Sequence, residues 1–486
     1  MRKLYPVIFP LLFSCILSAG PLHGAETVTI HSETVQDKIR GGLLGQIFAN
    51  LNGLQHENKY IHQPGNVTEY IPSLPDGAEA DDDTDIEWVY ILAMQEHGLF
   101  VPYNVLSDAW KKHINRYIWC SHQYVRQLLN LGIPSELTGS ETLNPWGEFN
   151  IAGQFTCEMF GQMSPLMPQS AGRWATYYLR IAVDGEPLQT TQFYTTMIAL
   201  AFETDDISRL LDAGLEAVDP QSNVYEIVRN TRKWCADNPD DWKAARKLIH
   251  DTYTKHEGRY RDINGYELNT AATVAALIYG KGDYVNTSIH AFNFGWDADN
   301  TAATAGTIIG VIRGEKWFKQ QGWTIKDVYR NTRRDEMPMD ETVTSFGNRL
   351  IELTEKQILA QGGKITAGLD GSLYEIRVEK PANVLPLNLL KDQRTKALDV
   401  LVEDVTKAFG GGTSTIPPAG LAYLAICLDR DKTLRERNPA QWNEWIEALS
   451  QRQEFLKIIG GGQDVPTRAL FREKLRSAGV RFPGTN

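Results

Sequence analysis

The stretch GWDADNTAATAGTIIG, residues 295–310, decides the fold class, because it is an acid-rich entrance to a helix that has to be buried. Asp297 and Asp299 stand two residues apart, and Asn300 follows at once. The small and apolar residues of 302–310 are typical of a tightly packed, buried helix. Oxygen donors gathered at the start of such a helix suit a hard cation such as Mg²⁺. Helix capping by Asp and Asn is the alternative explanation.

A second acid cluster lies at residues 79–85, EADDDTD, where five of seven residues carry carboxylates. The apolar residues that follow recur at helical spacing, at positions 86, 89, 92 and 93. The carboxylates repel one another, and a bound cation would relieve that repulsion. The alternative is a solvated acidic loop in which Asp83 or Thr84 caps the helix. Two acidic helix starts in one chain favour a shared metal centre.

Composition excludes several classes of protein. The chain has 486 residues, a formal net charge of −11 and 42% hydrophobic residues, which fits a soluble globular protein of more than one domain. Because the chain is acidic and has no basic run, we expect no nucleic-acid partner. The cysteines that follow residue 25 are widely scattered, so they predict neither a metal site nor a disulfide scaffold.

The first 25 residues are predicted to be a signal peptide. Arg2 and Lys3 precede an apolar stretch, residues 4–17, that is too short to span a bilayer, and cleavage after Ala25 is favoured. A lipoprotein anchor through Cys15 is the less favoured alternative, because Phe13 and the short apolar stretch match a lipobox poorly. We therefore expect a secreted or periplasmic protein without a membrane span.

The rest of the chain reads as two parts. Residues 26–362 are predicted to be an all-α catalytic domain, because helical periodicity dominates and alternating strand patterns are scarce. Residues 363–486 are predicted to be a small mixed, mainly helical appendage that begins with a hairpin at Asp370-Gly371. The predicted helices of both parts are 39–51, 85–96, 193–202, 207–218, 240–253, 269–279, 394–409, 421–428, 442–459 and 467–478.

Three separated motifs resemble those of the ADP-ribosylglycohydrolase superfamily, which includes dinitrogenase reductase-activating glycohydrolase and the ADP-ribosyl-acceptor hydrolases. Residues 40–46 (RGGLLGQ), continuing through Gly53 to Glu57, are similar to the family's R-G-x-x-x-G opening and its later G-D-A-L-G-x-x-x-E. Residues 81–84 (DDDT) are similar to T-D-D-T, and residues 291–300 (AFNFGWDADN) to A-x-N-x-G-G-D-T-D-T. The resemblance covers roughly residues 36–330.

The resemblance implies a compact all-α fold with two Mg²⁺ ions at its centre, Mn²⁺ being the alternative ion. Asp81 and Asn300 stand where the family has Thr, and both keep an oxygen donor. The metal ligands that the resemblance implies are Asp81, Asp82, Asp83, Asp297, Asp299 and Asn300.

Glu57 and Asp83 are the implied catalytic residues. Glu57 matches a glutamate that works beside the metals, where it would act as general base or acid. Without the motif, Glu57 would read as a surface residue in a Gly/Asn-rich loop. The implied reaction is metal-assisted hydrolysis of a glycosidic bond, in which water attacks the anomeric carbon.

The chain departs from the family motifs at positions that bear on substrate binding. Ala49-Asn50 replaces Gly-Asp, Trp296 replaces a glycine, and residues 181–197 lack the Thr-His pair that helps many members bind ADP-ribose. No Gly-rich loop with nearby basic residues would clearly hold a pyrophosphate. Trp296 and Asn293 are predicted to bind substrate, although packing is an equal alternative for Trp296. For Trp119, core packing is favoured over a sugar contact.

Three functions therefore stay open. The first is an exported Mg²⁺-dependent glycohydrolase whose small-molecule or glycan substrate is a carbohydrate or glycoconjugate. The second is a genuine ADP-ribosyl-protein hydrolase. The third is a sugar-binding protein that keeps the metals and has lost turnover.

Overall fold

The structure is a computed structural model that describes residues 26–79, 81–368, 371–381, 384–460 and 466–483. The predicted signal peptide, residues 1–25, and with it Cys15, lies outside the described residues. No helix in the described part of the chain is both long enough and apolar enough to cross a membrane.

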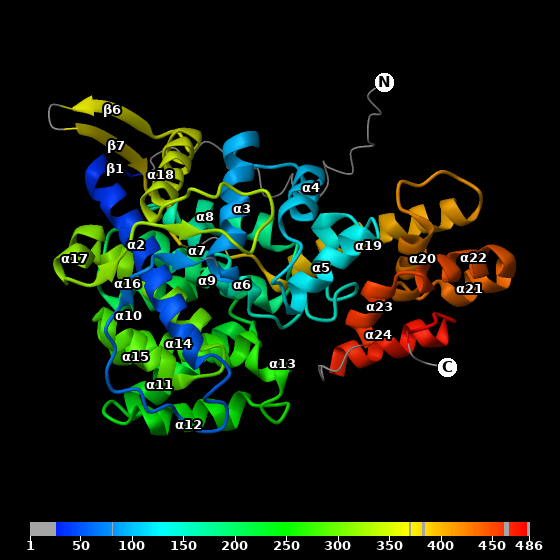
Figure 1. Ribbon diagram of the computed structural model, residues 1–486, viewed down its shortest axis with the longest axis horizontal. Helices are drawn as coiled ribbons and strands as arrows, with labels where there is room; N and C mark the ends of the chain where they lie inside the picture. The colour runs from blue at the N-terminus through cyan, green and yellow to red at the C-terminus, as the bar shows by residue number, and fades with distance from the viewer. Residues whose placement is uncertain (1–25, 80, 369–370, 382–383, 461–465, 484–486) are drawn as a thin grey trace.

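Helices build almost the whole molecule, as expected for an all-α protein (Figure 1). The helices of the larger body are α2 (Ser32–Gly53), α3 (Asp82–His97), α4 (Tyr103–His113), α5 (Cys120–Asn130), α6 (Ala152–Phe155), α7 (Glu158–Gln162), α8 (Pro168–Leu179), α9 (Glu186–Leu200), α10 (Ile207–Glu216), α11 (Asn223–Asp237), α12 (Trp242–Tyr253), α13 (Tyr260–Ile263), α14 (Tyr266–Gly280), α15 (Tyr284–Phe294), α16 (Ala298–Arg313), α17 (Glu315–Gln320) and α18 (Val343–Ala360), with short 3₁₀ turns η1 (Leu54–His56) and η2 (Ser135–Leu137).

Helices α2 and α16 cross in backbone contact at the centre of this body. Glycines make the contact: a Cβ on Gly45 would lie 2.1 Å from the carbonyl oxygen of Gly306, and one on Gly310 would lie 2.3 Å from that of Gly41. Further along, a Cβ on Gly53 would lie 2.8 Å from the Cα of Asp299. The close contact therefore extends to the C-terminal end of α2 and the N-terminal end of α16.

Short strands join segments that are far apart in sequence. The predicted hairpin strands are confirmed as β6 (Lys364–Gly368) and β7 (Gly371–Arg377), while Asp370 of the predicted turn lies outside the described residues. Strand β7 also pairs with the N-terminal strand β1 (Thr27–His31), giving the order β1-β7-β6. Two parallel pairs join β2 (Ser73–Leu74) to β4 (Thr324–Ile325), and β3 (Ala78–Glu79) to β5 (Tyr329–Arg330). The β3–β5 pair brings the segment after residue 330 next to the acid cluster at 81–85.

The C-terminal helices gather at one end of the molecule, on the right in Figure 1, and contact the larger body, where Arg394 pairs with Asp184 at 2.9 Å. They are α19 (Leu387–Phe409), α20 (Pro418–Cys427), α21 (Asp431–Arg437), α22 (Pro439–Ser450), α23 (Gln453–Gly460) and α24 (Pro466–Ser477). The single helix predicted over 442–459 is wrong, because the chain turns between α22 and α23. Apolar residues continue at helical spacing across the turn because both helices contact α20. Helix α22 packs along α20, and Phe455 of α23 lies edge-on to Tyr423 of α20, with ring centroids 5.2 Å apart. The domain boundary at 362/363 stays a prediction.

Candidate metal centre

A cavity of about 380 Å³ opens where α2 ends and where α3 and α16 begin. Its wall combines carboxylates, amides and aromatic rings with one basic residue. The lining residues are Leu54, Glu57, Asn58, Asp81, Asp82, Trp119, Cys120, Asn150, Ile151, Phe155, Tyr260, Asn264, Asp297, Asp299, Asn300 and Arg333.

Carboxylates gather in two groups at this cavity, and both groups contain Asp299. One joins Glu57, Asp297 and Asp299, and the other joins Asp81, Asp83 and Asp299. Within each group, oxygen atoms of the three side chains all lie within 4.8 Å of one another. Except for Glu57, which is partly exposed, these side chains are buried. A shared carboxylate between two such groups is an arrangement that can bridge two cations.

Capping does not explain these acids. Asp81 and Asp297 are the N-cap residues of α3 and α16, yet neither side chain accepts a hydrogen bond from a backbone N–H of its helix. Asp83 and Thr84, the capping candidates in the sequence, lie inside α3 and not at its cap. Asp206 at the start of α10 shows the ordinary cap, accepting from the backbone N–H groups of Ser208 and Arg209 at 2.9 and 3.2 Å. The capping alternative for the two acid clusters is therefore wrong.

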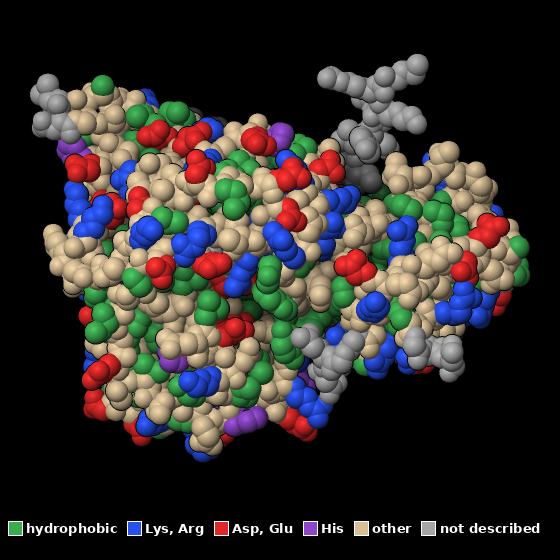
Figure 2. Space-filling model, viewed as in Figure 1, with side chains coloured by type: hydrophobic (Ala, Val, Ile, Leu, Met, Phe, Trp, Pro, Cys, Tyr) green, Lys and Arg blue, Asp and Glu red, His purple; other side chains and the backbone are tan. Residues whose placement is uncertain are grey.

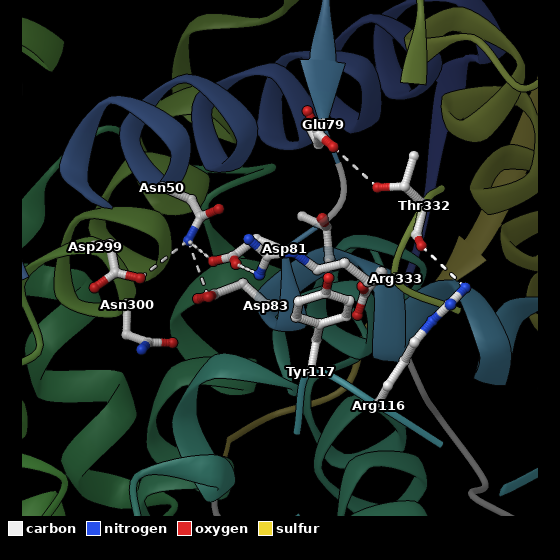
Figure 3. Close-up of polar contacts among 12 residues, drawn as sticks. Asn50, Glu79, Asp81, Asp83, Arg116, Tyr117, Asp299, Asn300, Thr332 and Arg333 are labelled. Carbon is white, nitrogen blue, oxygen red and sulfur yellow. Dashed lines mark hydrogen bonds and ion pairs between the residues drawn. The ribbon is translucent and has the colours of Figure 1, made fainter. Parts of the chain in front are cut away.

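Asn50 and Arg333 hold the second carboxylate group in place (Figure 3). The Asn50 amide, near the end of α2, donates to Asp83 at 2.9 Å, to Asp81 at 3.3 Å and to Asp299 at 3.5 Å. The Arg333 guanidinium forms an ion pair with the other oxygen of Asp81. Polar partners that orient ligating carboxylates are a regular part of metal sites.

Asp297, in the first group, is oriented in the same way. It accepts hydrogen bonds from the side-chain amides of Asn264, at 3.0 Å, and Asn300, which lies one turn along α16. Its own N–H donates to the Asn269 side chain at 3.2 Å. Amides from α14 and from the loop before it therefore help to set the geometry of this group.

Several oxygen atoms at the centre accept no hydrogen bond in the described part of the chain. They are Oδ1 of Asp83, Oδ1 of Asp299 and Oδ1 of Asn300, all of them buried. Leaving buried polar oxygens without a partner costs free energy, and a cation ligated by them would remove that cost. The oxygen-only donor set fits Mg²⁺ or another hard divalent ion.

Burial and mutual repulsion raise the pKa values of these carboxyls. Burial is the main cause for Asp82, Asp83 and Asp299, whose pKa values lie well above the usual range, and neighbouring carboxylates raise them further. Burial, then Asp297 and then Asp81, raises the pKa of Glu57 to about 7. These groups favour their protonated forms until positive charge enters the site.

The part of the chain that forms this cavity matches a known family in sequence. The family model of ADP-ribosylglycohydrolase matches residues 31–358. The chain belongs to the ADP-ribosylglycohydrolase family. This family cleaves glycosidic bonds, so the chain carries a hydrolase domain. No curated protein matches the chain.

The ADP-ribosylglycohydrolase domain brings most of the predicted site residues together. Glu57, Asp81, Asp83, Asp297 and Asp299 make up the two carboxylate groups. Asp82 and Asn300 line the same cavity but belong to neither group of three. Glu57, predicted as a catalytic residue, also lies within reach of a cation. The assignment of these residues as ligands stays a prediction.

Asn293 and Trp296 lie outside the cavity lining. The Asn293 side chain exchanges two hydrogen bonds with the backbone of Val67, each of 2.8 Å. Trp296 is fully buried beneath Arg246, whose guanidinium lies 4.6 Å from the ring centroid and also donates to the carbonyl of Tyr60. In the glycohydrolase domain both residues hold the loop that carries Glu57, and direct substrate contact stays a prediction.

Other residues of the glycohydrolase cavity carry no clear signal in the sequence, or lie elsewhere than their pattern indicates. Core packing of Trp119 is wrong, because its side chain is 42% exposed and lines the cavity. Asn264 and Asn58 belong to no motif, and Arg333 lies in a segment that only the β3–β5 pairing brings to the acids. The available signal for Arg333 was a pair of arginines, Arg333-Arg334, in an acidic chain.

Two more carboxyls, Glu87 and Glu158, are buried in the core of the glycohydrolase domain. Glu158 accepts from Thr304 at 2.6 Å and from the backbone N–H of Cys157 at 3.1 Å, while Glu87 accepts from Gln46 at 3.0 Å. Burial raises the pKa of Glu158 to about 8. Burial and then Glu158 raise the pKa of Glu87 well above its usual range.

We expect Glu158→Gln to make the stability of the protein less dependent on pH. The folded pKa of Glu158 lies above the unfolded value of 4.5, so its stabilising contribution is full at low pH and is lost as pH rises toward 8. Ionisation of this group should lower the free energy of unfolding by about 2 kcal/mol as the pH rises from 6 to 8. Urea denaturation in EDTA measures the difference between the two pH profiles. The exposed Glu226→Gln is the control, and parallel profiles for Glu158→Gln and wild type would refute the assignment.

Proposed function

We propose that this protein is a Mg²⁺-dependent glycohydrolase that cleaves a glycosidic bond of a carbohydrate or glycoconjugate. The observation that carries the proposal is the pair of carboxylate groups sharing Asp299, with unpartnered buried oxygens, at a cavity large enough for a small ligand. Asp81, Asp82, Asp83, Asp297, Asp299 and Asn300 would hold two ions, with Mn²⁺ as the alternative metal.

Bound Mg²⁺ would supply positive charge that polarises sugar hydroxyls and makes water more acidic. Glu57 is the residue placed to move a proton. Asn58 donates to its Oε1 at 2.8 Å, which leaves Oε2 without a donor from that neighbour. Burial, the first cause of its raised pKa, makes the Glu57 carboxylate a better base than an exposed glutamate. In the proposed step Glu57 takes a proton from the attacking water, whose oxygen bonds to the anomeric carbon as the bond from that carbon to the leaving oxygen breaks. The leaving oxygen then takes up a proton, returned by Glu57 or supplied by solvent.

Two other functions compete with this one. The family match favours a genuine ADP-ribosyl-protein hydrolase as the second candidate. A sugar-binding protein without turnover is the third, since Asn50 stands where the family motif has Asp. The predicted signal peptide favours the carbohydrate substrate, because ADP-ribosylated proteins are mostly cytoplasmic. Export to the periplasm or the medium is part of this proposal.

One screen separates the candidates. The protein from residue 26 onward is incubated with Mg²⁺ or EDTA and offered a panel of glycosides, ADP-ribosyl-arginine and ADP-ribosyl-serine. Hydrolysis of glycosides that EDTA abolishes supports the proposed function. Release of ADP-ribose alone supports the second candidate. Binding without turnover of any substrate supports the third and contradicts the proposal.

Replacing Glu57 by Gln tests the role of its proton. Gln keeps the shape and one oxygen but cannot accept a proton, so we expect kcat to fall by about 10²–10⁴-fold with a small change in KM. The limb of the pH–rate profile that belongs to Glu57 should disappear. Glu69→Gln, an exposed residue of the following loop, is the matched control. An unchanged kcat in Glu57→Gln would exclude Glu57 as the general base.

A further inference from the structure

Two exposed aromatic side chains stand on the loop that forms one rim of the cavity. Tyr117 is 53% exposed and Trp119 is 42% exposed. Among the large hydrophobic side chains exposed in the described residues, these are the two aromatic ones; the others are aliphatic or methionine. Trp119 lines the cavity directly, and Tyr117 lies beside Arg333, whose guanidinium is 5.5 Å from the ring centroid (Figure 3).

The backbone of this loop is held in a costly conformation. Tyr117 and Cys120 have φ values of +49° and +51°, which residues with a side chain rarely adopt. Such strain persists where surrounding contacts enforce it, and it is concentrated at functional sites. At Tyr117 the contact is with Arg334, whose buried guanidinium donates to the carbonyls of Arg116 and Tyr117 at 2.7 and 2.8 Å.

The same loop is tied to the core and to the carboxylates. Arg334 pairs with Asp85 at 2.8 Å, and both side chains are fully buried. The thiol of Cys120 donates to Asn264 at 3.2 Å, and the Asn264 amide in turn donates to Asp297. These contacts therefore fix the position of Trp119 with respect to the candidate metal centre.

The side chains of the cavity wall offer no free positive charge to an anionic ligand. Arg333 is the one basic residue among the described lining residues, and it is already paired with Asp81. The remaining polar wall is carboxylate and amide, from residues such as Asn58, Asn150 and Asn264. These groups hydrogen-bond sugar hydroxyls, whereas a pyrophosphate would find no unpaired cation of the chain here. Figure 2 also shows acidic and basic side chains interspersed over the visible face, without an extended basic tract.

We propose that Trp119, with Tyr117 beside it, is a stacking platform for an uncharged sugar ring next to the ring that is cut. A cavity of about 380 Å³ is near the lower end of ligand-site sizes, so a second ring of the substrate lies at the rim where Trp119 is exposed. The substrate class is a neutral saccharide of at least two rings. The identity of the cut bond rests on the proposed function, while ring binding at Trp119 is independent of turnover.

Binding to an array of neutral oligosaccharides tests the platform. Metal-loaded wild-type protein is compared with Trp119→Ala, Trp119→Phe and Tyr117→Ala, and Trp234→Ala is the control for loss of a half-buried tryptophan elsewhere. We expect Trp119→Ala to bind its best saccharide about tenfold more weakly at unchanged melting temperature, and Trp119→Phe to recover most of the affinity. ADP-ribose is added as a soluble competitor, and we expect it not to compete.

Three results would overturn the platform: unchanged affinity in Trp119→Ala, no saccharide bound by wild-type protein, or displacement by ADP-ribose as effective as by the saccharide. The Asp299→Ala variant separates this inference from the proposed function. If Asp299→Ala loses hydrolysis while Trp119→Ala binds normally, the hydrolase stands and the platform fails. If Trp119→Ala loses binding while Asp299→Ala is fully active, the platform stands and the metal mechanism fails.

Discussion

Asp299→Ala is expected to abolish both cation binding and hydrolysis. Asp299 belongs to both carboxylate groups, and its buried Oδ1 has no hydrogen-bond donor in the described part of the chain. Loss of groups that merely orient metal ligands costs about 10–100-fold in activity. Loss of the shared carboxylate itself should therefore lower kcat by at least about a thousandfold. Calorimetric titration with Mn²⁺ should detect no tight site, and activity on the substrate found by the screen should be at background.

The matched control for this variant is Asp206→Ala. Asp206 also begins a helix, but it is exposed and accepts backbone hydrogen bonds as a cap. Its loss should cost about 1 kcal/mol of stability and leave Mn²⁺ binding and kcat unchanged. If Asp299→Ala still bound Mn²⁺ tightly and hydrolysed substrate at the wild-type rate, the carboxylate groups would not be the metal centre.

Gly45→Ala is expected to have the largest effect on folding. The new Cβ would lie 2.1 Å from the carbonyl oxygen of Gly306. That oxygen is a backbone atom and the Cβ is fixed to the backbone of α2, so neither can swing aside as the end of a flexible side chain could. Overpacking a core costs about 1–3 kcal/mol where side chains can adjust, and a backbone clash should cost more. We expect little soluble protein, or a fall of more than about 4 kcal/mol in the free energy of unfolding.

Gly347→Ala in α18 is the control for that substitution. Its Cβ would meet the Cγ of Arg40 at 3.1 Å, which is part of a flexible side chain, and then the Cδ2 of Leu43 at 3.8 Å. A helical Gly→Ala change gains about 1 kcal/mol of helix propensity, so stability should change by less than about 1 kcal/mol. Urea denaturation compares the two variants. Wild-type stability and Mn²⁺ affinity in Gly45→Ala would contradict the close α2–α16 crossing.

Patterns along the chain predicted the all-α class and the hairpin, and they drew attention to the acids that meet at the cavity. Helical periodicity and the small residues of 302–310 are local properties, and they were enough for the all-α class. Periodicity could not reveal the turn between α22 and α23, because both helices bury apolar side chains at helical spacing, Trp445 and Leu449 in α22 and Phe455 and Ile459 in α23. The local sequence pattern shows which residues are apolar but not where the chain changes direction.

Two tryptophans show that the sequence pattern does not predict the exposure of a side chain. Trp296 stands inside a motif and was a candidate for substrate contact, yet it is fully buried under Arg246. Trp119 was expected in the core, yet it is exposed at the cavity. Indole has the same chemistry in both places. Its exposure depends on the direction of the backbone and on neighbours such as Arg334, which come from distant parts of the chain.

By itself the sequence determined the helical class, the family and the carboxylates, because these depend on residue type and short spacing. Residues 295–310 already held Asp297, Asp299 and the glycines that let α16 meet α2. Only the tertiary structure decided that Asp299 is shared by two groups, that Arg333 pairs with Asp81, and that Trp119 stands at the rim. These contacts join segments up to about 250 residues apart, so they follow from packing of helices and the short β3–β5 pair.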